Sequence, residues 1–365
     1  MKILHICETI KGGVATYLNT FDTLCGGETD NIYLVPEHHA DQLTVAGRIE
    51  TFPAQGRGAG TVAALCRAAL RMARAEKPDI LFFQSSFSLI AMAWLRLHRV
   101  PGKYAYCPHC WGQVPYSEQP SKRRLVAAVE GRLVGLSDMV VNIAHNDRAI
   151  AEASGYRGRH IVVENALPDL PAGAADVSPY DAGETKRLNL LFVGRFDRQK
   201  GLDLLLDAFA EAVKRNPDLY LHVVGAGVVD GGQAGPVAPP RTHFHDWVPP
   251  QRIAAYYRHA DLVVMPSRWE GLPMVLIEAL RAGTPVMLSN RSGMEQLVED
   301  GRSGFVLPLS VERFAEALGS VDAARLAAMR PAARALYEKR YGPDRFRRET
   351  MAALRDTLGN AGSGR

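Results

Sequence analysis

The feature that most constrains this chain is a regular alternation of short apolar runs with longer segments of helical periodicity. In the first half, runs of strand length and rich in β-branched residues lie at residues 3–7, 32–35, 80–83, 104–107, 139–143 and 161–163. Strands that alternate with helices form parallel sheets through right-handed crossovers. Residues 1 to about 165 are therefore predicted to form one doubly wound α/β domain.

The alternation stops after this first domain and then starts again. Residues 168–186 are rich in Pro, Gly, Ala and Asp and have no apolar period, which is the composition of a linker. Six further strands are predicted at residues 189–193, 219–224, 243–245, 262–265, 286–288 and 305–307. Residues 311–358 are predicted to be helical, with breaks near Ser320 and at Gly342-Pro343.

These segments predict two tandem Rossmann-like domains. At 365 residues the chain can bury two cores. We place the first domain at residues 1–170, a linker at 171–187 and the second domain at 188–342. In such sheets ligands bind outside the carboxyl ends of the strands, so we expect the site in a cleft between the two domains.

Composition excludes several classes of protein. A net charge of +4 is too small to indicate binding to nucleic acid, although it is compatible with small anionic ligands. The apolar start of the chain is too short for a signal peptide, and residues 87–95 are about half as long as a bilayer span. Five cysteines, all before residue 111, fit reduced thiols. We therefore expect a cytoplasmic protein without membrane spans.

The most informative segment runs from residue 266 to residue 286. It follows an apolar strand and leads into a helix expected to begin near Leu272 or Pro273. Glu270 lies on the loop and Glu278 lies nearly two turns into the helix, so the two carboxylates suit the hydroxyls of a sugar and a ribose. Unpaired N–H groups of residues 271–275 at the helix start favour an anion or hydroxyl ligand. The alternative interpretation of Glu278 is an ordinary exposed helix carboxylate.

A second segment places two cations after another strand. The strand ends at Val193-Gly194, and Arg195 and Lys200 lie on the loop before the next helix. A guanidinium can bind phosphate oxygens in a bidentate manner, and an ammonium adds a point charge. The pair suits a diphosphate, whereas either residue alone could equally be a solvated loop cation.

Together these segments resemble the retaining GT-B glycosyltransferases of group 1, also called family 4. The resemblance is carried by Gly194-Arg195 with Lys200-Gly201, by the E-x7-E spacing of Glu270 and Glu278, and by Gly12-Gly13-Val14 after the first strand. It extends over nearly the whole chain. It implies an α/β GT-B fold with a central cleft, in which the last helix, about residues 343–365, returns to the N-terminal domain.

The resemblance also implies roles for residues of this chain. The N-terminal domain would bind the acceptor, and the C-terminal domain would bind a nucleotide diphosphate sugar. His109, Arg195, Lys200 and Glu270 would act at the reaction centre, with His109 and Glu270 on the transferred sugar and Arg195 and Lys200 on the diphosphate. Further donor contacts would come from Gly12, Gly13, Gly194, Val248, Gly271, Leu272, Pro273, Met274, Val275 and Glu278.

The implied reaction retains the anomeric configuration. The leaving diphosphate would help to deprotonate the acceptor, while Arg195 and Lys200 offset its developing charge. No cofactor is implied beyond the nucleotide sugar as co-substrate, and the absence of an Asp-x-Asp motif agrees with a reaction that needs no metal. The resemblance favours a UDP-sugar and a saccharide or lipid-linked acceptor of surface polysaccharide synthesis.

Other functions stay open at this point. Cys107-Pro108-His109-Cys110 is similar to the active-site motif of thioredoxin-related thiol oxidants, but it follows several α/β units instead of one strand. A nucleotide-sugar epimerase shares the expected fold, and a regulatory protein on the same scaffold is a third alternative.

One helix suggests peripheral association with a membrane. Lys122, Arg123 and Arg124 begin an amphipathic helix that extends to about Gly135. It could rest on an anionic membrane near a lipid-linked acceptor, at the inner face of the cytoplasmic membrane. A helix that faces the core and has a solvated charged end explains the same pattern.

Overall fold

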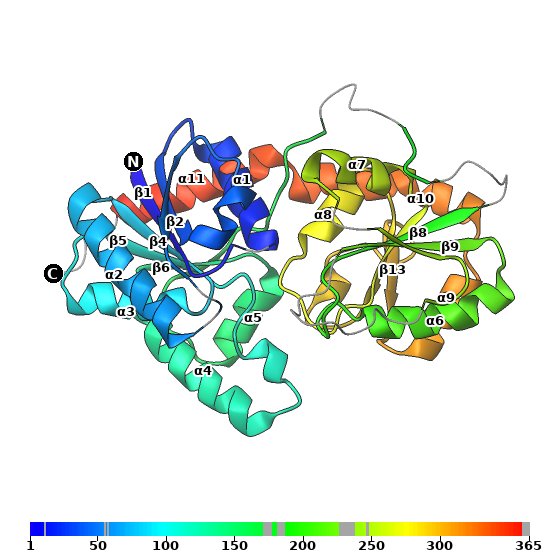
Figure 1. Cartoon of the computed structure of the whole chain (residues 1–365), viewed down its shortest axis with the longest axis horizontal. Coiled ribbons are helices and arrows are strands. Elements are labelled where there is room, and N and C mark those ends of the chain that lie inside the picture. The colour runs from blue at the N-terminus through cyan, green and yellow to red at the C-terminus, as the bar shows by residue number, and fades with distance from the viewer. Residues whose placement is uncertain are drawn as a thin grey trace. The chain divides into compact units, whose positions relative to one another are not determined.

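The computed structural model describes residues 1–10, 12–54, 56, 58–170, 177–180, 187–225, 238–245 and 248–359. Contacts divide the chain into two compact units (Figure 1). The first unit contains Met1–Pro168 and Pro343–Arg365, and the second contains Asp169–Gly342. Most of the expected linker, residues 171–187, lies outside the described residues.

The first unit is built on a parallel seven-stranded sheet with the order β3-β2-β1-β4-β5-β6-β7. Its central strands are buried on both faces, which explains their continuous apolar sequences. The strands are β1 (Lys2–Cys7), β2 (Asp30–Pro36), β3 (Arg48–Phe52), β4 (Ile80–Gln84), β5 (Lys103–Cys107), β6 (Met139–Asn142) and β7 (His160–Val162).

The sequence patterns did not predict β3. This strand lies at the edge of the sheet, and only Phe52 of its five residues is fully buried. An edge strand with polar, half-exposed residues has no apolar run, so the pattern that revealed the other strands is missing here.

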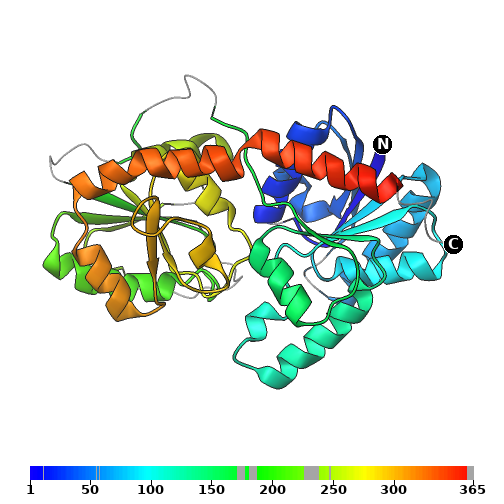
Figure 2. The ribbon, with the colours of Figure 1, turned by 180° about the vertical axis from the view of Figure 1, so that it is seen from behind.

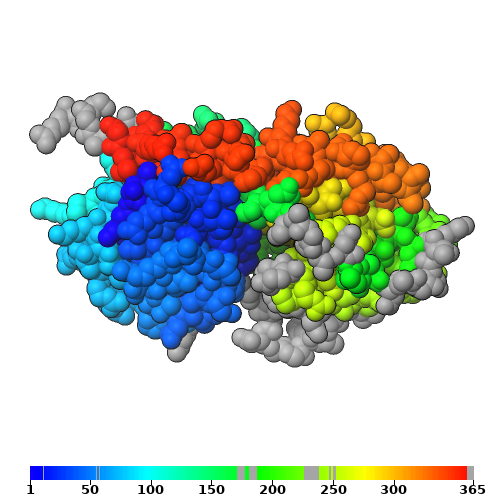
Figure 3. All heavy atoms as spheres, turned by 90° about the horizontal axis from the view of Figure 1, so that it is seen from above, coloured from blue at the N-terminus to red at the C-terminus, as the bar shows by residue number. Residues whose placement is uncertain are grey.

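Helices cover both faces of this sheet. One core cluster joins residues of α2 (Ala59–Glu76), α3 (Ser88–Leu97), α4 (Pro120–Val134) and α5 (His145–Ala153) to one face. On the opposite face α1 (Gly13–Cys25) packs against α11 (Pro343–Gly359), where the rings of Tyr17 and Phe346 lie 6.0 Å apart. Figures 2 and 3 show the red α11 lying along the blue N-terminal residues of its own unit. The last helix therefore returns to the first unit, as the resemblance implied.

The second unit contains a parallel six-stranded sheet with the order β10-β9-β8-β11-β12-β13. Its strands are β8 (Leu188–Val193), β9 (Leu219–Val224), β10 (Thr242–His245), β11 (Leu262–Met265), β12 (Val286–Ser289) and β13 (Gly304–Leu307). Its helices are α6 (Leu202–Arg215), α7 (Pro250–His259), α8 (Met274–Arg281), α9 (Val311–Gly319) and α10 (Ala323–Leu336).

The tail is helical with interruptions where they were predicted. A break follows α9 at Ser320, and a π-helical turn, Tyr337–Tyr341, connects α10 to Gly342 and α11. Within the described part of the chain, no helix is long and apolar enough to cross a membrane.

Candidate functional site

The candidate residues of the second unit lie where the strand order of its sheet reverses. Strand β8 pairs with β9 on one side and with β11 on the other, which makes the β8/β11 edge the switch point of the sheet. The loop after β8 meets the segment after β11, because the N–H of Arg268 donates to the carbonyl of Gln199 at 2.8 Å. The two sequence segments that predicted a ligand site are therefore neighbours in space.

Lys200 and Glu270 form a close ion pair at this position. Lys200 Nζ lies 2.6 Å from Glu270 Oε1, and the side chains are only 18% and 6% exposed. Ser267 Oγ donates to the same carboxylate oxygen at 2.9 Å, and Gln199 Nε2 donates to the other at 3.3 Å. The carboxylate is thus held by one cation and two neutral donors in a poorly solvated place.

Arg195 joins this arrangement through Gln199. Arg195 Nη2 donates to Gln199 Oε1 at 2.9 Å, so one glutamine connects the guanidinium to Glu270. Arg195 Nε lies 2.9 Å from Asp197 Oδ2, but without the alignment of a hydrogen bond. We call Arg195, Gln199, Lys200, Ser267 and Glu270 the switch-point network.

Two glycines permit close approaches of the backbone, Gly201 toward the segment after β11 and Gly225, after β9, toward the end of β8. Gly201 has a φ of +71°, and a Cβ atom there would lie 2.1 Å from the carbonyl oxygen of Pro266. Gly225 has a φ of +146°, and its Cβ atom would lie 1.9 Å from the carbonyl oxygen of Gly194. Because a side chain would meet backbone at either position, the path of the loop after β8 requires glycine at both.

Glu278 is not an ordinary exposed carboxylate. It is half-buried, and Tyr257 Oη donates to its Oε2 at 2.5 Å. Burial raises the pKa of Glu278, and the hydrogen bond from Tyr257 partly opposes this rise. The side chain is therefore oriented by a partner from α7, which leaves its Oε1 able to accept a further hydrogen bond.

The start of α8 corrects one expectation. The helix begins at Met274, one residue after its N-cap Pro273. Proline has no N–H group, so the expectation that residues 271–275 all donate to a ligand is wrong for Pro273. The backbone N–H groups of this segment are those of Gly271, Leu272, Met274 and Val275.

Val248 is not brought into the switch-point network. It lies half-buried between β10 and α7, and its neighbours Asp246 and Trp247 are outside the described residues.

In the first unit, Gly12 and Gly13 follow β1 and start α1. Gly12 has φ 74° and ψ −124°, a conformation that favours glycine, and a Cβ atom there would have no atom within 4 Å. The requirement for glycine at residue 12 is thus one of backbone conformation, and the space in front of it is open. Gly13 is the first residue of α1.

His109 lies after β5 in a strained, left-handed conformation with φ 56°. Its Nε2 lies 2.7 Å from Gln84 Oε1, an oxygen that can only accept, so Nε2 carries the proton and Nδ1 is an acceptor. The ring also packs edge-on against Tyr17 at 4.9 Å. Burial lowers the pKa of His109 from 6.5 to about 3. The side chain is therefore a neutral, oriented imidazole at physiological pH.

The cysteines beside His109 lack the features of a redox centre. Cys107 is fully buried at the end of β5, Cys110 is half-buried, and both are free thiols. Burial raises the pKa of Cys107 far above its usual value, which opposes formation of the reactive thiolate. The motif is followed by a short 3-10 turn at Val114–Tyr116 instead of a long helix. Among the described residues, no group of His, Cys, Asp or Glu could hold a metal ion.

Sequence reasoning missed Gln199, Ser267, Tyr257 and Gln84. Each is a polar residue that orients a predicted site residue through a hydrogen bond. Gln84 could have been suspected, because it is the polar residue that ends an otherwise apolar strand.

Comparison with known proteins identifies the class of protein. A family model described as "Glycosyl transferase 4-like domain" matches residues 23–166, and one described as "Glycosyl transferases group 1" matches residues 187–321. The chain is a glycosyltransferase of the GT-B type. The first family match lies within the first unit and the second within the second unit, so each half of the enzyme is recognised independently.

Curated relatives of this glycosyltransferase are distant. An "Uncharacterized 41.2 kDa protein in cps region" of Klebsiella pneumoniae is 27% identical over 316 residues, which cover 84% of this chain and 86% of the relative. A D-inositol 3-phosphate glycosyltransferase of Rhodococcus opacus is 33% identical over 215 residues, which cover 51% of this chain and 48% of the relative. The match thus spans about half the length of the Rhodococcus enzyme.

Solved structures confirm the GT-B fold. Sucrose-phosphate synthase from Thermosynechococcus elongatus matches with a TM-score of 0.81 at 18% identity, over 99% of each chain. Anabaena HepE in complex with UDP-glucose matches with a TM-score of 0.76 at 20% identity, over 98% of this chain and 100% of HepE.

Proposed function

We propose that this glycosyltransferase transfers a sugar from a UDP-sugar, with retention of the anomeric configuration, to a saccharide or lipid-linked acceptor of surface polysaccharide synthesis. The observation that carries the proposal is the switch-point network, which places Arg195, Lys200 and Glu270 together at the carboxyl ends of β8 and β11. Two cations beside a carboxylate suit a ligand that combines a diphosphate with sugar hydroxyls.

Residues of the second unit would bind the donor. Arg195 and Lys200 would bind the diphosphate, and Glu270 would accept hydrogen bonds from the transferred sugar. Glu278, oriented by Tyr257, would accept hydrogen bonds from the ribose. Further contacts are proposed from Gly194, Val248, Gly271, Leu272, Met274 and Val275.

Residues of the first unit would bind the acceptor and approach the reacting sugar. Gly12 presents backbone beside open space, and Gly13 begins α1. His109 would contact the transferred sugar, and because its Nδ1 is an acceptor, it would accept a hydrogen bond from a sugar hydroxyl.

The proposed reaction needs no protein nucleophile. The bond from the anomeric carbon to the diphosphate oxygen breaks as the acceptor oxygen forms a bond to that carbon on the same face. The acceptor proton passes to the leaving diphosphate. Arg195 and Lys200 lower the barrier by stabilising the charge that develops on the leaving group. No cofactor or metal ion takes part in this scheme.

Named relatives support the choice of substrates. HepE is described in complex with UDP-glucose, which supports a UDP-sugar donor. The Klebsiella relative is described as a protein of a cps region, which supports a role in polysaccharide synthesis. Lipid-linked acceptors of such synthesis would place the enzyme in the cytoplasm, at the inner face of the membrane.

A thermal-shift screen against UDP, GDP, ADP, dTDP and CMP tests the donor site. A ligand present at 100 times its Kd should stabilise the protein by about 2.7 kcal/mol. We expect a selective rise of Tm with UDP that is lost in Glu278→Ala. No rise with any nucleotide would contradict the proposal, and a rise with another base alone would replace UDP as the donor nucleotide.

Retention has its own test. Once a transferring donor is found, proton NMR of the first product formed should show the anomeric configuration of the donor sugar. An inverted product would refute the proposed same-face substitution, and a new nucleotide sugar formed without acceptor would indicate an epimerase.

A further inference from the structure

Helix α3 of the first unit exposes a continuous apolar stripe that begins at its N-cap, Phe87. Phe87, Ile90, Trp94 and Leu97 are 42%, 41%, 38% and 73% exposed. Their spacing of three, four and three residues places all four on one side of the helix. Scattered apolar residues are normal at a protein surface, but a row of four large side chains on one helix marks an interaction surface.

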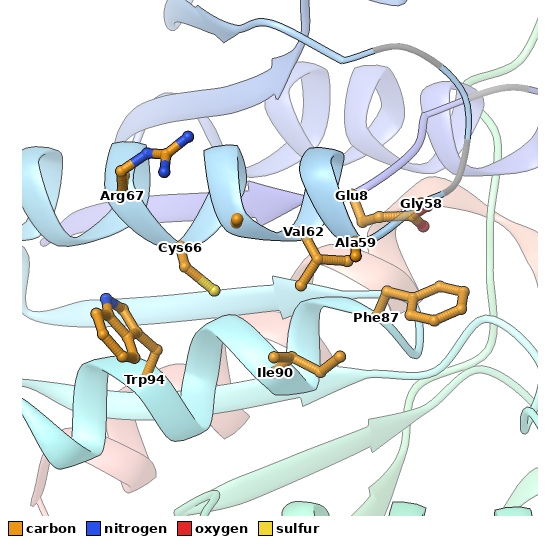
Figure 4. Close-up of a pocket in the computed structure, with 10 residues that line it drawn as sticks. Glu8, Gly58, Ala59, Val62, Cys66, Arg67, Phe87, Ile90 and Trp94 are labelled. Carbon is orange, nitrogen blue, oxygen red and sulfur yellow. The ribbon is translucent and has the colours of Figure 1, made fainter.

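A groove runs beside this stripe, between α3 and α2. It has a volume of about 720 Å³, and Val62, Ala63 and Cys66 of α2 line it opposite residues of α3. Figure 4 shows side chains of both helices facing each other across it, with Trp94 and Arg67 at one end. At the other end lie Glu8 and Gly58, at the carboxyl edge of the sheet.

Cations flank the apolar stripe on both sides. Helix α3 packs between α2 and α4. On α2, Arg67, Arg71 and Arg74 are exposed at intervals of four and three residues, so they form a row on one side of the helix. Arg71 and Arg74 take part in none of the ion pairs between described residues.

Helix α4 extends the same kind of surface. Leu125 and Val129 are 65% and 54% exposed, so the interpretation of this helix as facing the core is wrong for these two residues. Arg124 and Arg132 are exposed on the same helix, and the one acidic residue within it, Glu130, is buried and accepts hydrogen bonds from Ser86 and Gly112. No exposed acidic residue within α4 itself therefore offsets its arginines.

We infer that the surface formed by α2, α3 and α4 docks on an anionic phospholipid bilayer. The aromatic and aliphatic side chains of α3 enter the headgroup boundary, and the groove receives an acyl chain of one lipid. The arginines of α2 and α4 contact phosphate groups on either side. Apolar residues between two rows of cations are the complement of such a membrane surface.

A second copy of this chain is a poorer occupant of the same surface. Two identical faces brought together would oppose the arginines of α2 and α4 with arginines of the partner, and like charges repel. The inference extends the proposed use of lipid-linked acceptors. It does not depend on that use, because the binding to vesicles is measured without donor or acceptor.

Vesicle flotation with matched leucine and valine variants tests the apolar stripe. We expect the full chain to float with vesicles that contain phosphatidylcholine and about one third phosphatidylglycerol. Leu97→Ser should lower the partition coefficient of the chain between vesicles and water about tenfold, because one leucine side chain is no longer buried in the bilayer. Val177→Ser changes a residue of the second unit with almost the same exposure, 76% against 73%, and should float like the unmodified chain.

A matched pair of arginines tests the cationic rows. Arg71→Ser should weaken flotation about fivefold, and high salt should weaken it further. Arg348 is an exposed arginine of α11 on the opposite face of the same unit, so Arg348→Ser should have little effect. Equal losses in both variants would show attraction by net charge alone and would overturn the assignment of the face.

Trp94 reports on the groove directly. Lipids with brominated acyl chains should quench the fluorescence of Trp94, and this quenching should be absent in Trp94→Phe. Absence of flotation with anionic vesicles would overturn the inference, as would a lipid-free dimer that Leu97→Ser dissociates. Stabilisation by UDP should persist in Leu97→Ser and Arg71→Ser, so failure of the donor site and failure of the membrane surface remain distinguishable.

Discussion

Replacing Lys200 should destabilise the second unit as well as impair catalysis. The substitution Lys200→Ala leaves the carboxylate of Glu270, which is 6% exposed, without the cation that lies 2.6 Å away. Removal of one partner of a buried ion pair costs about 3–5 kcal/mol. Because Ser267 and Gln199 still donate to Glu270, we expect the lower end, about 3 kcal/mol.

Urea unfolding and a double-mutant cycle measure this cost. Adding Glu270→Gln removes the buried charge, and the double variant should recover to within about 1 kcal/mol of the unmodified chain. Lys214→Ala is the control, because Lys214 Nζ also lies 2.6 Å from a carboxylate oxygen, Glu211 Oε1, but the two side chains are 65% and 55% exposed. An exposed pair contributes little, so this variant should unfold like the unmodified chain.

The same cycle isolates the role of Lys200 in binding. If Lys200 binds the diphosphate, the stable double variant should still lose most of its stabilisation by UDP. If Lys200 serves only to neutralise Glu270, the double variant should bind UDP normally. Our reasoning about the ion pair would be refuted by a Lys200→Ala variant that loses no more stability than Lys214→Ala.

Three further predictions follow from glycine conformation and buried titratable groups. Gly201→Ala should lose about 2 kcal/mol or more of stability, whereas Gly301→Ala, with a φ of +74° but open space around it, should lose about 1 kcal/mol; urea titration compares them. The folded pKa of His109, about 3, is below its unfolded value of 6.5, so the unfolded chain binds more protons and stability falls as the pH drops from 6.5 toward 3. The free energy of unfolding should therefore fall by about 2 kcal/mol less between about pH 7 and pH 5 in His109→Gln than in the unmodified chain. An equal fall in both proteins would contradict a neutral buried ring. Burial raises the pKa of Asp147 from 3.8 to about 7, so the folded chain binds more protons than the unfolded chain and its stability falls as the pH rises from 3.8 through 7. Asp147→Asn should therefore raise the urea midpoint at about pH 8 but not at about pH 4.

Much of the fold was predictable because buried parallel strands have a continuous apolar sequence. Strands such as β4 and β11 are fully buried and stood out for that reason. The edge strand β3 escaped notice because its residues are polar and half-exposed. Sequence periodicity therefore reveals burial, and it misses strands whose place is determined by backbone hydrogen bonds alone.

The candidate site was predictable in its charged residues and not in their supports. Arg195, Lys200 and Glu270 follow strands that end at one edge of a sheet, so their proximity could be inferred. The contribution of Gln199 depends on a partner 71 positions away, and no local pattern carries that information. The requirement for glycine at residue 201 likewise arises from the carbonyl of Pro266 across the sheet.

The apolar stripe of α3 illustrates a different limit. The sequence shows only that residues 87–95 are too short for a membrane span, because an apolar helix next to a sheet is normally explained by the core. The structure shows that one side of this helix packs inward through Leu89, Met92 and Leu95, while Ile90 and Trp94 remain exposed. The two sides of this helix can be distinguished only from the burial of individual residues in the structure.

The pairing of charges in the switch-point network bears on how a donor would bind. In the structure Lys200 is paired with Glu270, and Arg195 lies beside Asp197, so two carboxylates balance the two cations. A diphosphate that binds Arg195 and Lys200 must compete with these carboxylates. Binding would then free Glu270 to accept hydrogen bonds from the sugar, at the time when the phosphates supply the negative charge that Lys200 requires. On this reasoning Glu270→Gln should bind UDP more tightly than the unmodified chain and still transfer sugar more slowly, and weaker UDP binding in Glu270→Gln would show that the carboxylate does not compete with the diphosphate.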